Sequence, residues 1–187
     1  MSDLYLIEQL FDKINNLPKG EYERCTFNGC DFSEHDFSGS KFSECIFKNC
    51  NLSLAKLNKT SLSETNFRDC KMLGLRFDTC NAFGLSFSFE NCRLNHSSFY
   101  RTKIKKTVFR NSQLQETDFS EADLTDAVFD NCNFQQAVFD RTILEKADFR
   151  TSYNFSIDPE NNRVRKAKFS MAGALGLLSK YDLSIDP

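Results

Sequence analysis

The sequence has no tryptophan, only three prolines and two histidines, and seven glycines among its 187 residues. No segment approaches the ~18 consecutive apolar residues of a membrane span. The N-terminus MSDLYLIEQLFDKI lacks the basic start and long apolar run of a signal peptide. A formal net charge of −2 gives no bulk electrostatic case for binding nucleic acid or a membrane. These absences predict a soluble, cytoplasmic protein in which the eight cysteines stay reduced.

Motifs for catalysis and cofactor binding are also missing. The sequence contains no P-loop, HExxH motif, nucleophile elbow or glycine-rich cofactor loop. His35 falls in a column of residues expected to point inward, where a neutral buried imidazole is expected rather than a general base. We therefore predict a protein that is not an enzyme and that uses no cofactor.

Phenylalanine is the residue in excess, at 20 of 187 residues. Counted in fives from Phe27, one apolar residue recurs in nearly every block to Phe87; after a slip of two residues the series resumes at Leu94 and runs to Phe149. A period of five fits neither an α-helix nor a flat strand. A chain that turns a corner every five residues would place residues 20 apart on neighbouring coils, at the β spacing of ~4.8 Å.

A small residue lies two positions before most apolar centres, and all eight cysteines occupy this column. They are Cys25, Cys30, Cys45, Cys50, Cys70, Cys80, Cys92 and Cys132. We interpret them as small, buried apolar filler, because only a small side chain fits beside a stacked phenylalanine. A line of thiols ~4.8 Å apart is not a tetrahedral zinc site, and parallel stacked side chains make a disulfide torsion awkward. We predict no metal site.

The blocks themselves carry a resemblance to a known family. ADLTD (122–126), TDFSE (117–121), CDFSE (30–34) and ADFRT (147–151) are good instances of its repeat. The sequence resembles the pentapeptide-repeat family, with a distant similarity to its Qnr/MfpA-like group, over residues 20–153. This resemblance implies an all-β solenoid, a right-handed quadrilateral β-helix with four blocks per coil and the central Phe or Leu inward.

With four blocks per coil, every fourth apolar centre falls on the same side of the β-helix. We place the two extra residues as a bulge near 88–91, which gives one unbroken phenylalanine ladder as the structural core: Phe27, Phe47, Phe67, Phe87, Phe109, Phe129 and Phe149. Outward residues 20 apart then alternate in sign in three sets: Arg101, Glu121 and Arg141; Lys106, Asp126 and Lys146; and Arg110, Asp130 and Arg150. Opposite charges on neighbouring rungs favour pairing, which supports this register.

Both ends of a solenoid need a cap. The apolar spacing of Leu4, Ile7, Phe11 and Ile14 predicts a short helix over residues 3–15, so residues 1–19 form a capping helix and linker before the 20–153 β-helix. Residues 154–187 are predicted as a loop, one last block and a short helix with a tail. The candidate cap or dimer residues there are Leu175, Leu177, Leu178 and Leu183. The resemblance implies a homodimer through the C-terminal end.

The functional prediction is a non-catalytic, protein-binding rod whose partner the sequence does not name. The alternative comes from the resemblance: Qnr/MfpA-like members mimic DNA, bind DNA gyrase or topoisomerase IV, and relieve quinolone inhibition. The candidate acidic interaction surface for that alternative is Glu116, Asp118, Glu121, Asp123, Asp126 and Asp130. Residues 91–115 carry only basic charges, so neighbouring coils are expected to neutralise part of this surface. The chain also lacks the long projecting loops of several Qnr proteins.

Overall fold

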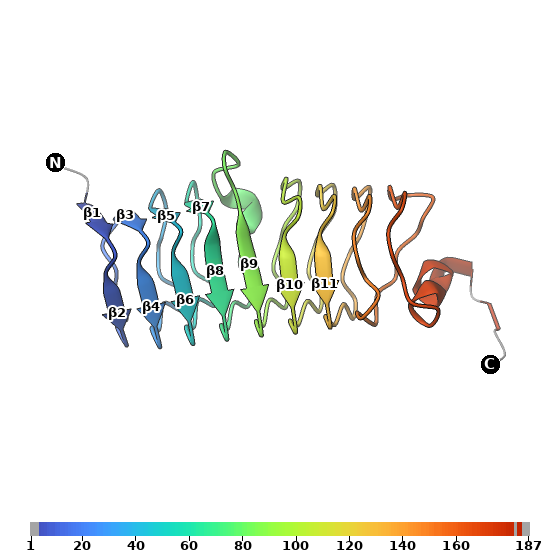
Figure 1. Cartoon of the computed structure of the whole chain (residues 1–187), viewed down its shortest axis with the longest axis horizontal. Helices are drawn as coiled ribbons and strands as arrows, with labels where there is room; N and C mark the ends of the chain where they lie inside the picture. Colours follow the sequence, from blue (N-terminus) through green and yellow to red (C-terminus); the bar gives the residue numbers. More distant parts are fainter. Residues whose placement is uncertain (1–3, 182, 185–187) are drawn as a thin grey trace.

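The computed structural model describes residues 4–181 and 183–184, and it is a β-solenoid of stacked coils (Figure 1). Its paired strands are all parallel. One sheet, in the order β1-β3-β5-β7, contains β1 (Leu4–Ile7), β3 (Gly20–Glu23), β5 (Lys41–Ser43) and β7 (Ser61–Ser63). The other, in the order β11-β10-β9-β8-β6-β4-β2, contains β2 (Leu10–Asp12), β4 (Thr26–Asn28), β6 (Ile46–Lys48), β8 (Thr65–Arg68), β9 (Phe87–Glu90), β10 (Val108–Arg110) and β11 (Val128–Asp130). Isolated parallel bridges such as Asp31↔Asn51 and Asp36↔Lys56 form the remaining two sides.

The predicted repeat of four blocks per coil is confirmed by the pairing register. Phe27 lies beside Phe47, and Phe109 beside Phe129, each pair 20 residues apart. Their rings stack with centroids 4.5 Å and 5.0 Å apart, at interplanar angles of 13° and 18°. The core is therefore a continuous aromatic stack along the axis, and Phe169 extends it beyond Phe149 with centroids 5.4 Å apart.

The small inward residues do more than fill space. Their side chains donate hydrogen bonds to the backbone carbonyl of the preceding coil, 23 residues earlier: Thr60 Oγ1 to the Phe37 oxygen at 2.9 Å, and Cys50 Sγ to the Phe27 oxygen at 3.4 Å. Ser152 Oγ does the same to the Phe129 oxygen at 2.8 Å. A hydroxyl or thiol is therefore useful in this column because it satisfies a buried carbonyl, a role that the sequence alone did not reveal.

Most corners of the coils use a residue in the left-handed backbone region. Asn111 and Asn131 have φ of 49° and 54°, and Glu121 has φ of 57°. The backbone N–H of the corner residue donates a hydrogen bond to a carbonyl oxygen of the next coil. For example, the Glu121 N–H donates to the Asp140 oxygen at 2.8 Å. Asparagine tolerates this conformation better than most residues. This accounts for Asn91, Asn111 and Asn131, which occupy the corner that follows β9, β10 and β11.

The position of the two-residue insertion differs from the prediction. β8 pairs with β9 in the register Thr65↔Phe87 and Phe67↔Phe89, so Phe89 and not Phe87 continues the phenylalanine ladder. The extra residues therefore lie before β9, between Asn81 and Phe87, rather than at 88–91. Ala82, which the five-residue count predicted to point inward, is exposed. Phe87 is buried and occupies the column of small inward residues, where it pairs with Thr65. The five-residue repeat does not show where the two extra residues lie, because Phe87 and Phe89 both suit an inward position.

The predicted N-terminal helix is wrong. Leu4–Ile7 and Leu10–Asp12 form β1 and β2, which pair with β3 and β4 in the register Leu6↔Tyr22 and Phe11↔Phe27. The rings of Phe11 and Phe27 stack 4.9 Å apart at 7°. An isolated helix this short is marginal in water, whereas the strand lets Phe11 extend the aromatic stack. This first coil is shorter than the others, with 16 residues between register partners, which hid its repeat.

The C-terminal helix is replaced by two short 3₁₀ turns, η2 (Gly173–Leu177) and η3 (Ser179–Tyr181). A third, η1 (Phe77–Thr79), lies within the repeat region. Gly176 lies against Phe155, where an added Cβ would collide with the Phe155 carbonyl oxygen and ring, so the turns need glycine to pack on the last coil. The last block around Phe169 is confirmed, and the tail beyond Ser184 lies outside the described residues.

Candidate protein-interaction surfaces

The six predicted acidic residues lie around one coil rather than on one face. Glu116, Glu121 and Asp126 are corner residues with positive φ. Asp118 and Asp123 lie on two different sides, bridged to Val138 and Ile143, and Asp130 ends β11. The structure thus wraps these carboxylates around the rod, and it does not bring them together in a single patch.

Lysine or arginine residues of the neighbouring coils pair with three of these six acids. Glu121 lies between two guanidinium groups, with Arg101 Nε at 2.6 Å and Arg141 Nη2 at 3.1 Å. The hydrogen bond from Arg101 holds the pKa of Glu121 below its ordinary value, and the charge of Arg141 adds to this. Asp123 and Asp130 pair with Lys105 at 3.2 Å and Arg110 at 3.3 Å. The predicted pairing of Glu121 with Arg101 and Arg141 is therefore confirmed, as is that of Asp130 with Arg110, and half of the acidic residues of this coil are neutralised by its neighbours.

One predicted set of rungs does not pair directly. Among the ion pairs of the described residues, none joins Lys106 or Lys146 to Asp126, and Arg150 binds Asp148 on its own coil at 2.7 Å rather than Asp130. Glu116 instead lies beside a residue that the charge pattern ignored, with His96 Nδ1 3.3 Å from Glu116 Oε2. Exposed pairs of this kind contribute ~0–1 kcal/mol each, so they set the surface charge more than the stability.

The cysteines lie mostly in the interior of the coils. All eight cysteines are free, and seven are buried. Burial raises the pKa of Cys45 and of Cys132 to about 12, which keeps these thiols protonated and unreactive. Within the part of the chain that the structure describes, no group of three or more His, Cys, Asp or Glu side chains could hold a metal ion. None of the described helices could span a membrane.

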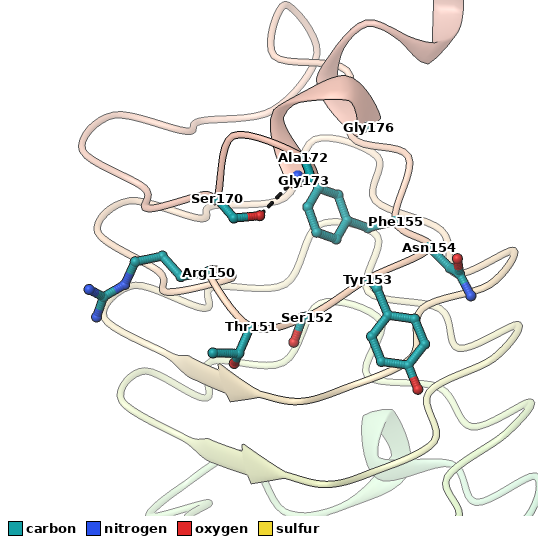
Figure 2. Close-up of a pocket in the computed structure, with 10 residues that line it drawn as sticks. All are labelled: Arg150, Thr151, Ser152, Tyr153, Asn154, Phe155, Ser170, Ala172, Gly173 and Gly176. Carbon is teal, nitrogen blue, oxygen red and sulfur yellow. Dashed lines mark hydrogen bonds between the residues drawn. The ribbon is translucent and has the colours of Figure 1, made fainter. Parts of the chain in front are cut away.

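The C-terminal end carries a cleft of about 410 Å³ between the last coil and the turn that follows Ser170 (Figure 2). Figure 2 shows the Phe155 ring directed toward Gly173, while the Arg150 side chain points outward. Ser170 Oγ accepts from the Gly173 N–H at 2.9 Å and holds the turn in place. Of the four predicted cap residues, Leu177 packs on the core, and Leu175, Leu178 and Leu183 are exposed.

The C-terminal turns are tied to the rod by an ionic cluster. Lys180 Nζ lies 2.8 Å from Asp158 and 2.7 Å from Glu160, and Tyr181 Oη donates to Glu160 at 2.9 Å. The hydrogen bond from Lys180 lowers the pKa of both carboxyl groups. These contacts explain how a segment with few buried residues still docks on the last coil.

This cluster gives a pH prediction. A carboxyl group whose pKa is lower in the folded state stabilises the fold above its unfolded pKa, about 4, and loses that contribution as the pH falls through its folded value. Acidification below about pH 4 is therefore expected to release residues 173–181 before the coils unfold. Hydrogen exchange of these amides across the pH range measures it. Lys180→Gln should remove the pH dependence, and equal protection of the segment at low and neutral pH would contradict the prediction.

The fold and the surface together define a class: a parallel β-solenoid with a filled aromatic core and polar outward columns. Two regions, residues 21–88 and 85–153, match the family described as pentapeptide repeat region. The matches cover most of the chain, and the protein belongs to the pentapeptide-repeat family. Comparison of the sequence with curated proteins gives no match.

Two solved structures illustrate the similarity. Full-length QnrB1, a plasmid-mediated fluoroquinolone resistance protein, superposes with a TM-score of 0.59 at 17% identity over 96% of this chain and 100% of that one. HetL is a pentapeptide repeat protein involved in heterocyst differentiation regulation in the cyanobacterium Nostoc sp. strain PCC 7120. It superposes with a TM-score of 0.52 at 16% identity, over 89% of this chain and 85% of that one. At these identities the likeness is one of fold.

Proposed function

We propose that this protein is a non-catalytic rod that binds another protein through its outward side chains. The observation that carries the proposal is the filled interior: the inward positions are occupied by stacked aromatic and aliphatic side chains, so the regular outward columns are what remains for recognition. Neighbouring outward residues are ordered along the axis, as where Asn95 Nδ2 donates to Gln115 Oε1 at 2.6 Å and Gln115 to Gln135 at 3.1 Å. Side chains ordered in this way lose less entropy when a partner docks.

Affinity capture followed by crosslinking mass spectrometry tests this proposal. The purified chain is the bait, and a heat-unfolded sample of the same chain is the matched control. We expect a protein retained only by the folded bait, with crosslinks from outward residues of consecutive coils. Retention that is equal on folded and unfolded bait, or no retained protein, would count against a binding rod.

The alternative, gyrase or topoisomerase IV protection by DNA mimicry, is less well supported by the surface charge. Duplex DNA carries one negative charge per ~1.7 Å of axis, whereas Glu121, Asp123 and Asp130 each face a basic residue of a neighbouring coil. The test is gyrase supercoiling in the presence of a quinolone. Protection that falls when Glu121, Asp123 and Asp126 become alanine would favour the alternative. A large excess of protein that neither protects nor inhibits gyrase would rule it out.

We also propose that two copies associate through their C-terminal ends. Met171 is 91% exposed, and Leu175, Leu178 and Tyr181 add apolar surface to the same segment. Leu175→Asp together with Leu178→Asp is expected to convert a dimer into a monomer in sedimentation velocity, because charges cannot be buried at an apolar contact. Leu54→Asp, an exposed leucine on the repeat region, is the matched control. A wild-type chain that is monomeric at all concentrations would contradict the proposal.

A further inference from the structure

The inserted loop before β9 presents a phenylalanine to solvent. Phe83 is 90% exposed, in contrast to the phenylalanines that fill the interior. The loop stands out beyond the turns of the neighbouring coils (Figure 1). An exposed aromatic residue at a projecting position costs solubility and adds nothing to the core, and buried aromatic anchors are typical of protein interfaces.

Hydrogen bonds hold this loop in one conformation. The Phe83 N–H donates to Asn81 Oδ1 at 3.1 Å, and Asn81 Nδ2 donates to Ser61 Oγ of the preceding coil at 3.2 Å. On the other side of the tip, Ser86 Oγ accepts from the Glu64 N–H at 2.8 Å. Gly84 supplies the positive φ of 68° that the turn requires. Phe83 is therefore presented on a loop that is tied to the rod on both sides, which reduces the entropy lost when it is buried by a partner.

A hollow of about 500 Å³ lies where the loop returns to the sheet. Ser86 and Phe87 form its loop side, Ile46 and Asn66 belong to the neighbouring coils, and Glu44 and Glu64 complete the lining. The hollow thus places Ile46 and Phe87 beside two carboxylates, and its loop side begins three residues after Phe83.

These two carboxylates carry like charges on neighbouring coils, as Lys48 and Arg68 do with the opposite sign. Glu44 and Glu64 are corner residues 20 positions apart, so they occupy the same corner on adjacent coils. Like charges on neighbouring rungs repel. Among the described residues, neither carboxylate takes part in an ion pair, whereas the acids of the later coils are mostly paired. Arg24 occupies this corner on the coil before Glu44, and its charge acts on Glu44, whereas the next coil places Ser86 beside Glu64. A second cation, supplied from outside beside Glu64, would relieve the remaining repulsion.

We infer that Phe83 and the Glu44/Glu64 hollow form one docking site for a protein that carries an apolar socket flanked by lysine or arginine. Phe83 enters the socket, and the partner's cation lies between the two carboxylates. The inference rests on the proposed protein-binding role and names the site and the chemistry of the partner. Charge complementarity selects a basic partner over an acidic one, and the preordered loop supplies the anchor.

A phage-displayed library of random peptides, selected on the purified full-length chain, provides the probe. We expect enriched peptides to combine apolar residues with Lys or Arg. In fluorescence anisotropy, Phe83→Thr should weaken binding of these peptides by at least about tenfold. The double change Glu44→Gln and Glu64→Gln should weaken it at low salt and have little effect at high salt, because exposed charges are screened. Leu54→Thr and Glu34→Gln, exposed residues outside the site, are the matched controls and should bind as the wild type does.

The outcomes separate this inference from the broader function. Peptides that bind equally well to wild type and Phe83→Thr would overturn the docking site and leave a protein-binding rod in place. A library that yields no binder would count against both. Enriched peptides that are acidic would overturn the partner's chemistry, and self-association that is lost in Phe83→Thr would assign the loop to a second copy instead. Phe83→Thr should leave the melting temperature unchanged, because the side chain lies outside the core.

Discussion

Replacing Phe67 by alanine is expected to lower the free energy of unfolding by about 3–5 kcal/mol. Phe67 is 2% exposed and stacks on Phe47 and Phe89, with ring centroids 5.2 Å and 5.4 Å away. The substitution removes one ring from the middle of the stack. The coils above and below are joined by backbone hydrogen bonds and cannot close on the cavity. Urea unfolding followed by circular dichroism measures the change.

Cys50→Ala is the matched control for this prediction. Cys50 is equally buried, but its thiol is a weak donor, 3.4 Å from the Phe27 oxygen, and alanine occupies the same column elsewhere at Ala127 and Ala147. We expect the cost of Cys50→Ala to be well below that of Phe67→Ala. If Cys50→Ala abolished folding while Phe67→Ala was tolerated, the assignment of the core to the phenylalanine ladder would be wrong.

The regular part of the fold could be predicted from the sequence because its signal is repeated along most of the chain. The spacing of Phe27, Phe47 and Phe67 leads directly to their pairing in β4, β6 and β8. A β-solenoid has the same local environment in every coil, so each block adds independent support to the same register. A single block would have predicted nothing.

The ends could not be predicted, because there the repeat signal is interrupted and other patterns compete with it. Leu4, Ile7 and Phe11 have helical spacing, yet Phe11 gains more by stacking on Phe27 at 4.9 Å. At the other end, Gly173 and Gly176 favour tight turns that pack on Phe155 rather than an α-helix. In both places, contacts with the adjoining coil outweigh local propensity, and the sequence pattern does not contain those contacts.

The candidate surfaces were only partly accessible from the sequence. The charge alternation of Arg101, Glu121 and Arg141 predicted their pairing, since it depends on the register alone. Phe83 was missed because counting in fives treated residues 82–87 as regular blocks. The exposure of Phe83 depends on where the two extra residues lie, which that count did not reveal. A phenylalanine one position after the apolar centre is the signal that could have revealed it.

Phe87→Thr is expected to destabilise the protein by about 3–5 kcal/mol, although it restores the small residue that the repeat uses in this column. Phe87 pairs with Thr65 in the register and contacts Phe77 and Phe89, with centroids 5.2 Å and 5.1 Å away. Phe87 is buried against these two rings, so threonine would leave a cavity beside them.

Two matched substitutions make this prediction specific to the register. Phe83→Thr removes the same ring four residues earlier, but from an exposed position, and should change the free energy of unfolding by no more than about 0.5 kcal/mol. Phe89→Thr should be as damaging as Phe87→Thr, because Phe89 stacks between Phe67 and Phe109 at 5.4 Å and 5.0 Å. If the ladder ran through Phe87 instead, as the uninterrupted count of fives suggests, Phe89→Thr would be nearly neutral. Chemical unfolding of the three variants therefore decides where the insertion lies, and with it whether Phe83 is free to serve as an anchor.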